Sequence, residues 1–194
     1  MNLPNKITIV RMILIPFYLF FYLATFIPYG KLIATAILII ACLTDALDGY
    51  IARKYNLVTD LGKLLDPVAD KAFSMSALIL LVADGTLPNP YGVIIAVIFL
   101  LRDFLVSGIR QIAASKNTVI AADIWGKLKS IILDIALPML FVLAFLQIDL
   151  ALELKGFVLA YAIVCYVLIG ISTVLCFYSG LNYLIKNRKV LNER

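Results

Sequence analysis

Six apolar stretches, separated by short polar links, run through most of this chain and restrict the folds that it can adopt. They cover residues 7–27, 32–43, 72–83, 91–101, 131–146 and 157–184. Hydrophobic residues make up 63% of the 194 residues, whereas a soluble domain is about 45–50% apolar. Because a membrane-spanning helix needs about 20 residues, the shorter stretches must extend into their polar flanks. The sequence therefore predicts an all-α polytopic membrane protein, with six transmembrane helices in one bundle and a single domain over residues 1–194.

The positive charges predict the orientation of this bundle. If the amino terminus is cytosolic, only Lys31 and Lys155 of the 17 lysines and arginines fall on the outer side, as the positive-inside rule requires. Both termini are then cytosolic, and the first apolar stretch has no signal-peptide cleavage site, so we expect it to remain attached. The net charge of +5 does not indicate a nucleic-acid partner, since the cations lie beside helix ends rather than in a separate basic domain. Anionic lipid headgroups and phosphorylated substrates fit them better.

Four carboxylates interrupt the apolar pattern. The segment D-A-L-D-G-Y-I-A-R begins at Asp45 and contains Asp48, and G-K-L-L-D-P-V-A-D contains Asp66 and ends at Asp70. A carboxylate at the centre of a membrane helix costs about 2.5–3.5 kcal/mol, and spacings of three and four residues place each pair on one helix face. Two antiparallel helices joined by a short link can gather the four charges in one pocket. Hard oxygen ligands select ions such as Mg²⁺ and Mn²⁺, so the sequence predicts two divalent cations there, with Mg²⁺ as the first expectation.

Small and cationic residues accompany these carboxylates. Gly49 and Ala52 lack bulk on the same helix face, so a nucleotide or a phosphate could approach the backbone there. Arg53 and Lys63 supply cations for phosphate oxygens. Taken singly, small residues in membrane helices also serve close helix packing, and such cations also serve as anchors at the inner face. The chain has no histidine and three isolated cysteines, so a zinc site, a disulfide framework and Ser-His-Asp catalysis are not expected.

The acidic segment resembles the signature of the CDP-alcohol phosphatidyltransferase family, D-x-x-D-G-x-x-A-R followed by G-x-x-x-D-x-x-x-D. The resemblance implies a six-helix, usually homodimeric membrane enzyme, in which the hydroxyl of a second substrate displaces CMP from a CDP-linked lipid. This chain matches the signature without departure at Asp45, Asp48, Gly49, Ala52, Arg53, Gly62, Asp66 and Asp70.

The same resemblance implies roles for individual residues. The four aspartates would hold two metal ions, and Asp70 would also act as the general base. The absence of histidine leaves an aspartate as a suitable proton acceptor. The CDP moiety of the lipid would be contacted by Gly49, Ala52, Arg53, Thr59 and Asn5.

Three further segments are similar to a bacterial subfamily, the phosphatidylglycerophosphate synthases. These segments are 4–11, 102–110 and 126–129, although Asp103 stands where a glutamate is expected. Arg102 and Arg110 lie eight residues apart on one predicted helix and Lys127 opens the next, so three cations could converge on an anion. The resemblance implies transfer of the phosphatidyl group of CDP-diacylglycerol to sn-glycerol 3-phosphate, on the cytosolic face of a bacterial cell membrane. The phosphate of glycerol 3-phosphate would then bind to these three cations.

Several alternatives remain open from the sequence. Within the same family, the acceptor could be serine, inositol phosphate or phosphatidylglycerol, and the three cations favour a phosphorylated acceptor. Separately, these cations could be ordinary anchors at the inner face. From other classes, the chain could be a divalent-cation transporter or a non-catalytic lipid-binding scaffold. Transport sites tend to lie near the midplane of the bilayer at broken helices, whereas the carboxylates here cluster at one end of the predicted helices. No role can be assigned to Asp134 from the sequence.

Overall fold

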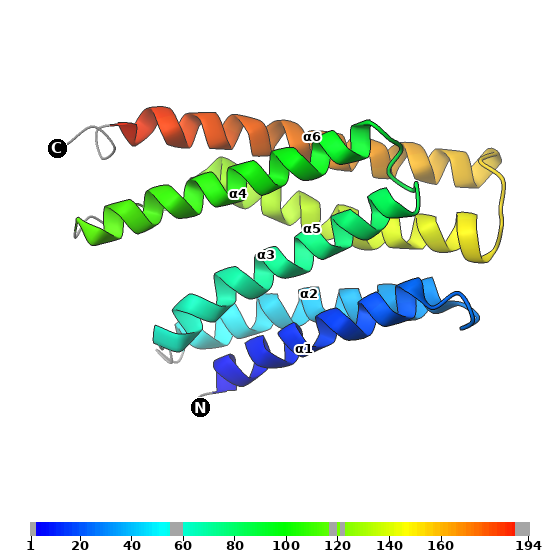
Figure 1. Ribbon diagram of the computed structural model, residues 1–194, viewed down its shortest axis with the longest axis horizontal. Coiled ribbons are helices and arrows are strands. Elements are labelled where there is room, and N and C mark those ends of the chain that lie inside the picture. Colours follow the sequence, from blue (N-terminus) through cyan, green and yellow to red (C-terminus); the bar gives the residue numbers. More distant parts are fainter. Residues whose placement is uncertain (1–2, 55–59, 117–119, 121–122, 189–194) are drawn as a thin grey trace.

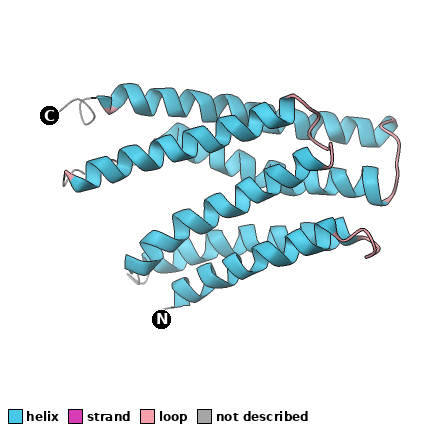
Figure 2. Ribbon diagram, in the orientation of Figure 1, coloured by secondary structure: helices cyan, strands magenta, loops and turns pink. Residues whose placement is uncertain are grey.

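The computed structural model describes residues 3–54, 60–116, 120 and 123–188, and within these ranges every regular element is a helix (Figure 2). A five-residue π-helical segment, η1, directly continues the fifth α-helix. The described helices confirm the predicted all-helical bundle and its six long elements. They are α1 (Leu3–Leu23), α2 (Gly30–Lys54), α3 (Asp60–Ala83), α4 (Tyr91–Ser115), α5 (Ile124–Ala144), η1 (Phe145–Asp149) and α6 (Gly156–Lys186).

The helices run along the long axis of the molecule and reverse direction at each link (Figure 1). Both chain termini lie at one end of the bundle, which we call the terminal end, and the links after α1, α3 and α5 lie at the opposite end, the far end. Because the direction alternates, the starts of α3 and α5 and the ends of α4 and α6 meet at the terminal end. This topology brings together residues from four helices that are far apart in the sequence.

All six α-helices contribute to one apolar core. Tyr18 of α1 packs edge to face on Phe73 of α3, with ring centres 5.5 Å apart, and its hydroxyl contacts Ser76. Cys165 and Cys176 of α6 are buried in this core. Other side chains that are at most 2% exposed include Leu38, Leu78, Leu81, Phe99, Leu137, Leu140, Phe141 and Ile169.

The outer faces of the helices carry large apolar side chains. Phe104 is 67% exposed, Val174 is 69% exposed and Ile185 is 67% exposed. Exposed apolar surface on this scale marks a surface that meets lipid or another protein. An apolar exterior around a packed core is the arrangement of a membrane protein.

Three helical stretches among the described residues are long and apolar enough to cross a membrane. They are α4, the continuous stretch Ile124–Asp149, and α6. The apolar parts of α1 and α2, Ile7–Leu23 and Gly30–Thr44, are shorter. The first half of α3 carries charged residues instead, because it contributes acidic and basic groups to the terminal end.

Some helix boundaries differ from those that the sequence indicated. The sequence indicates a third helix that begins around Gly62 or Lys63 and a fifth that begins at about Gly126, whereas α3 begins at Asp60 and α5 at Ile124. No proline or glycine stands at these starts to prevent the helix from beginning earlier. The α-helical part of the fifth element also ends at Ala144 rather than Leu146, because the chain continues in the wider π turn of η1.

Candidate functional site

A cleft with a volume of about 670 Å³ opens at the terminal end between α3, α4, α5 and the end of α6. We call it the terminal cleft. Its walls are unusually polar for this chain, and they include two of the predicted metal ligands and all three predicted phosphate-binding cations. The charged lining residues are Asp66, Asp70, Lys71, Arg102, Asp103, Arg110, Asp123, Lys127 and Lys129.

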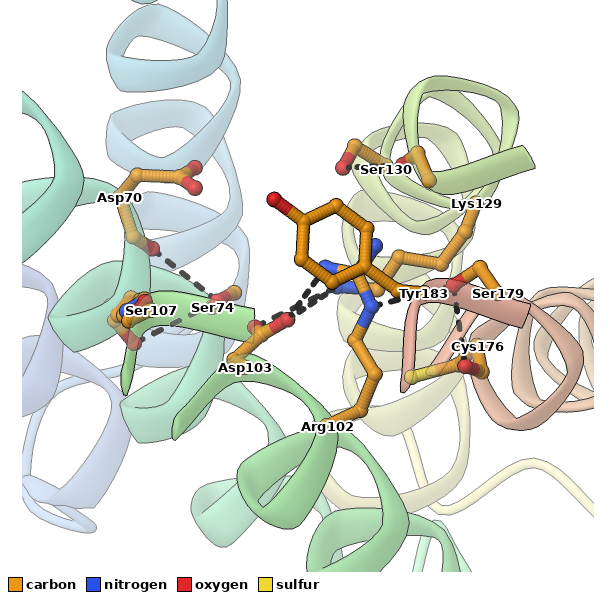
Figure 3. Close-up of polar contacts among 12 residues, drawn as sticks. Asp70, Ser74, Arg102, Asp103, Ser107, Lys129, Ser130, Cys176, Ser179 and Tyr183 are labelled. Atoms are coloured by element: carbon orange, nitrogen blue, oxygen red, sulfur yellow. Dashed lines mark hydrogen bonds and ion pairs between the residues drawn. The ribbon is translucent and has the colours of Figure 1, made fainter. Parts of the chain in front are cut away.

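Asp66 and Asp70 form the acidic wall of the terminal cleft. They lie one turn apart near the start of α3, so both carboxylates share one helix face, and both residues are exposed. The hydroxyl of Thr8 in α1 donates a hydrogen bond of 2.7 Å to Oδ1 of Asp66. The hydroxyl of Ser74 donates instead to the main-chain oxygen of Asp70, at 3.0 Å (Figure 3). Two carboxylates side by side in an open cleft offer the oxygen donors that Mg²⁺ and Mn²⁺ bind.

The other predicted site residues lie on α1, on α2, between α2 and α3, and at the start of α3. Among the side chains that the structure describes, no group of three or more acidic, histidine or cysteine residues comes together. The fit to a divalent cation is therefore supported here by Asp66 and Asp70 alone. The predicted residues whose side chains lie outside the described part are Asn5, Asp45, Asp48, Gly49, Ala52, Arg53, Thr59 and Lys63.

The structure brings Arg102 and Arg110 of α4 and Lys127 of α5 to the same cleft as the acidic wall. Arg110 and Lys127 are exposed. The Nε of Arg110 donates to the hydroxyl of Tyr183 at 3.3 Å, and its guanidinium carbon lies 5.8 Å from the centre of that ring. The tyrosine thus holds the stem of Arg110 while the outer nitrogens of the guanidinium can reach an anion in the cleft.

Arg102 is held more firmly than the other two cations. Its Nη1 lies 3.0 Å from Oδ1 of Asp103, and its Nε donates to the hydroxyl of Ser179 at 3.1 Å. Its side chain passes between two glycines: a methyl group at Gly126 would collide with Nη2, and one at Gly180 would lie 3.1 Å from Cγ. The missing side chains of these glycines leave the space that the arginine occupies.

Lys129 is a cleft residue that sequence reasoning missed. It is 4% exposed, its Nζ lies 3.2 Å from Oδ1 of Asp103, and it sits 4.8 Å from the centre of the Phe99 ring. Asp103 therefore bridges Arg102 and Lys129 (Figure 3). The motif G-K-L-K drew attention to Lys127, but residues two apart on a helix point to different sides. A helical projection of this motif against its apolar neighbours would have placed Lys129 on the buried side.

Lys71 and Ser107 are a second pair that the sequence did not reveal. The ammonium of Lys71, on α3, contacts the hydroxyl of Ser107, on α4. Both residues line the terminal cleft, and their contact joins its acidic wall to the helix that carries Arg102 and Arg110. The position of Lys71 directly after Asp70 was visible in the sequence, but its partner depends on how α3 packs on α4.

Asp134, which had no role from the sequence, lies close to the acidic wall. A small cavity of about 20 Å³ is lined by Arg11 of α1, Asp70 of α3 and Asp134 of α5, with three apolar neighbours. Arg11 is 2% exposed. A buried guanidinium next to two carboxylates lowers the cost of bringing their charges together.

The terminal cleft thus has an acidic wall on α3 and a cationic wall on α4 and α5. With a divalent cation at the acidic wall, the cleft could hold two phosphate-containing groups at once, one against each wall. Catalysis of phosphate transfer depends mainly on such positioning and charge stabilisation. The arrangement is therefore suited to a reaction between a diphosphate and a second anionic substrate.

The comparisons with known proteins agree with this chemistry. Residues 1–178 match the sequence profile of the CDP-alcohol phosphatidyltransferase family. A Bacillus subtilis protein named CDP-diacylglycerol–glycerol-3-phosphate 3-phosphatidyltransferase is 41% identical over 140 residues, which is 66% of this chain and 70% of that protein. The protein of the same name from Rickettsia bellii is 38% identical over 140 residues, or 72% of this chain and 74% of its own length.

A third relative carries a related name. The probable phosphatidylglycerophosphate synthase of Mycobacterium tuberculosis H37Rv is 38% identical over 144 residues, 73% of this chain and 66% of that protein. The match to the family profile covers the helices that build the terminal cleft, apart from the last residues of α6. The resemblance seen in the acidic signature is confirmed, and the chain belongs to the CDP-alcohol phosphatidyltransferase family.

Proposed function

We propose that this protein transfers the phosphatidyl group of CDP-diacylglycerol to sn-glycerol 3-phosphate, which gives phosphatidylglycerophosphate and CMP in phospholipid biosynthesis. The observation that carries the proposal is the terminal cleft, where Asp66 and Asp70 line the same cavity as Arg102, Arg110 and Lys127. The names of the Bacillus and Rickettsia relatives support the same pair of substrates.

Asp66 and Asp70, together with Asp45 and Asp48, are proposed to hold two divalent cations, with Mg²⁺ as the first expectation and Mn²⁺ as the alternative. Such ions would neutralise the diphosphate of the lipid and stabilise the departing CMP. The support is the oxygen-only donor set of the acidic wall and the i, i+4 spacing of its two described carboxylates on α3.

Asp70 is proposed as the general base. It accepts the proton of an acceptor hydroxyl, whose oxygen then bonds to the phosphorus that carries the diacylglycerol. The bond from this phosphorus to the bridging oxygen breaks, and CMP leaves with the electron pair. The exposure of Asp70 in the cleft and the lack of histidine in the chain both support this role.

The acceptor phosphate is proposed to bind at the cationic wall, on Arg110, Lys127 and Arg102. Arg110 and Lys127 are exposed in the cleft and can reach an anion directly. Arg102 and Lys129 share the carboxylate of Asp103, so this cluster keeps one unit of positive charge. An acceptor without a phosphate would leave these cations uncompensated, which favours glycerol 3-phosphate or inositol phosphate over serine.

The CDP-lipid is proposed to lie along α2 and the link that follows it. Its expected contacts are Gly49, Ala52, Arg53, Thr59 and Asn5. The protein would cross a bacterial cell membrane several times as a homodimer, with the terminal end and its cleft on the cytosolic face. The charge distribution supports this orientation. Among the described residues, the lysines that lie at the far end are Lys31 and Lys155.

An assay of CMP release tests this function. We expect purified protein with Mg²⁺, CDP-diacylglycerol and sn-glycerol 3-phosphate to release CMP, and we expect EDTA to stop the release. Asp70→Asn should abolish turnover while CDP-diacylglycerol still binds, because the amide cannot accept the proton. Glu153→Gln, a change of the same kind at a side chain that is 73% exposed at the far end, is the control. No CMP release by the wild type, or full turnover by Asp70→Asn, would contradict the proposal.

A further inference from the structure

Thr8 connects α1 to the acidic wall of the terminal cleft. It is 1% exposed, and its hydroxyl donates to Oδ1 of Asp66 across 58 residues of sequence, at 2.7 Å. Arg11 lies one turn further along α1, is 2% exposed, and lines a small cavity with Asp70. Residues three apart share a helix face, so a single face of α1 meets both carboxylates of α3.

The contact between Thr8 and Asp66 differs from the other hydroxyl contacts near the acidic wall. Ser74 donates to main-chain oxygens of α3, so it supports the helix and leaves carboxylate orientation unchanged. The hydroxyl of Thr8 comes from another helix and binds one carboxylate oxygen directly. Asp66 is exposed, and without this bond its side chain could rotate in the open cleft.

We propose that Thr8 is a positioning residue for the divalent-cation site. Its hydroxyl fixes Oδ1 of Asp66, so that Oδ2 and the remaining lone pair of Oδ1 face the cleft in one orientation. A group that hydrogen-bonds to a metal ligand in this way contributes to metal affinity without touching the ion. This inference rests on the proposed role of Asp66 as a metal ligand.

The affinity of the protein for Mn²⁺ can be measured without any enzymatic turnover, by titration with Mn²⁺ followed through the electron paramagnetic resonance signal of the free ion. Thr8→Val keeps the shape of the side chain and removes the hydroxyl, so it should weaken Mn²⁺ binding about tenfold. Thr8→Ser keeps the hydroxyl and should restore most of the affinity. Thr35→Val is the matched control, because Thr35 is 2% exposed and donates to the main-chain oxygen of Lys31 at 2.7 Å, within α2.

A second comparison separates positioning from a general loss of structure. In an Asp66→Asn background, Thr8→Val should cause no further loss of Mn²⁺ affinity, because the restrained ligand is already gone. Thr8→Ala replaces Thr8→Val if the latter does not fold. Wild-type Mn²⁺ affinity in Thr8→Val, equal losses of affinity in Thr8→Val and Thr35→Val, or an undiminished effect of Thr8→Val in the Asp66→Asn background would overturn the inference. If the wild type bound no Mn²⁺, the proposed metal site would be overturned as well. If the wild type bound Mn²⁺ and Thr8→Val bound it equally well, only the inference about Thr8 would be overturned.

Discussion

At the scale of single residues, the cations of the terminal cleft divide into two kinds. Arg102 and Lys129 are largely buried and share Asp103, whereas Arg110 and Lys127 are exposed. The buried pair and Asp103 together contribute one positive charge to the cationic wall, and the exposed pair contributes two more and can reach a substrate directly. Sequence spacing predicted that Arg102, Arg110 and Lys127 would converge. It could not predict the partners of Lys129 and Thr8, because these depend on how separate helices pack.

The exposed cations should control the affinity for the acceptor. Arg110→Ala should raise the KM for sn-glycerol 3-phosphate about 10–100-fold, the value of a hydrogen bond to a charged group, with little change in the KM for CDP-diacylglycerol. Steady-state kinetics with each substrate varied in turn measures both constants. Lys186→Ala, at an exposed position in the last turn of α6, should change neither. Equal increases in the two KM values would assign Arg110 to general stability instead of acceptor binding.

The glycine beside Arg102 provides a second test at this scale. Gly126→Ala should displace the guanidinium, because the new methyl group would collide with Nη2, and overpacking of this kind costs about 1–3 kcal/mol. We expect a higher KM for the acceptor and a lower melting temperature in detergent. Gly170→Ala on α6, where a methyl group would meet nothing within 4 Å, should leave both unchanged. If Gly126→Ala changed neither the KM for the acceptor nor the melting temperature, the present position of the Arg102 side chain would not be needed for acceptor binding or stability.

At the scale of elements, apolar patterning was enough to predict the number and order of the helices, and it placed the turn between α3 and α4 well. It failed at η1, because a π turn has no distinct apolar period and simply continues α5. It also could not reveal that η1 is tied to the start of α2. Lys31 pairs with Asp149 at 3.2 Å, and its main-chain nitrogen donates to the same carboxylate at 3.1 Å.

This tie predicts a difference between two ion pairs at the far end. Asp149→Ala should destabilise the protein by about 3–5 kcal/mol, because it leaves Lys31 without its carboxylate in a place where the two side chains are only 10% and 14% exposed. Glu153→Ala removes the partner of Lys155 in a pair that is 82% and 73% exposed, and it should cost about 0–1 kcal/mol. Thermal or denaturant unfolding in detergent measures the stability of both variants. Similar losses of stability in Asp149→Ala and Glu153→Ala would contradict the prediction that the buried pair contributes more.

At the scale of the whole molecule, the alternation of helix direction explains why the site lies at one end. The starts of α3 and α5 and the ends of α4 and α6 meet beside both termini (Figure 1). The positions of Asp66 and Asp70 and of the cations relative to helix ends were therefore predictable from the sequence. The shape and volume of the cleft were not, because they follow from the tilt of α3 across the bundle.

The proposed orientation can be tested in intact cells. Lys155→Cys at the far end should react with a membrane-impermeant maleimide, whereas Arg188→Cys at the terminal end should react only after the cells are opened. Both positions are exposed. The wild-type chain is the control for labelling of the native thiols, two of which, Cys165 and Cys176, are buried. The opposite labelling pattern would place the terminal cleft outside the cell.

The most direct test of the central claim is the rate of Mg²⁺-dependent CMP release from CDP-diacylglycerol with a panel of acceptors. We expect efficient release with sn-glycerol 3-phosphate and little with glycerol, which offers the same kind of hydroxyl but no phosphate for the cationic wall. Serine, inositol phosphate and phosphatidylglycerol complete the panel. Serine, which has no phosphate, should be a poor acceptor, whereas inositol phosphate carries a phosphate for the cationic wall and is the rival to sn-glycerol 3-phosphate. Glycerol or serine reacting as well as sn-glycerol 3-phosphate would contradict the claim that the two walls of the cleft hold two phosphate-containing substrates.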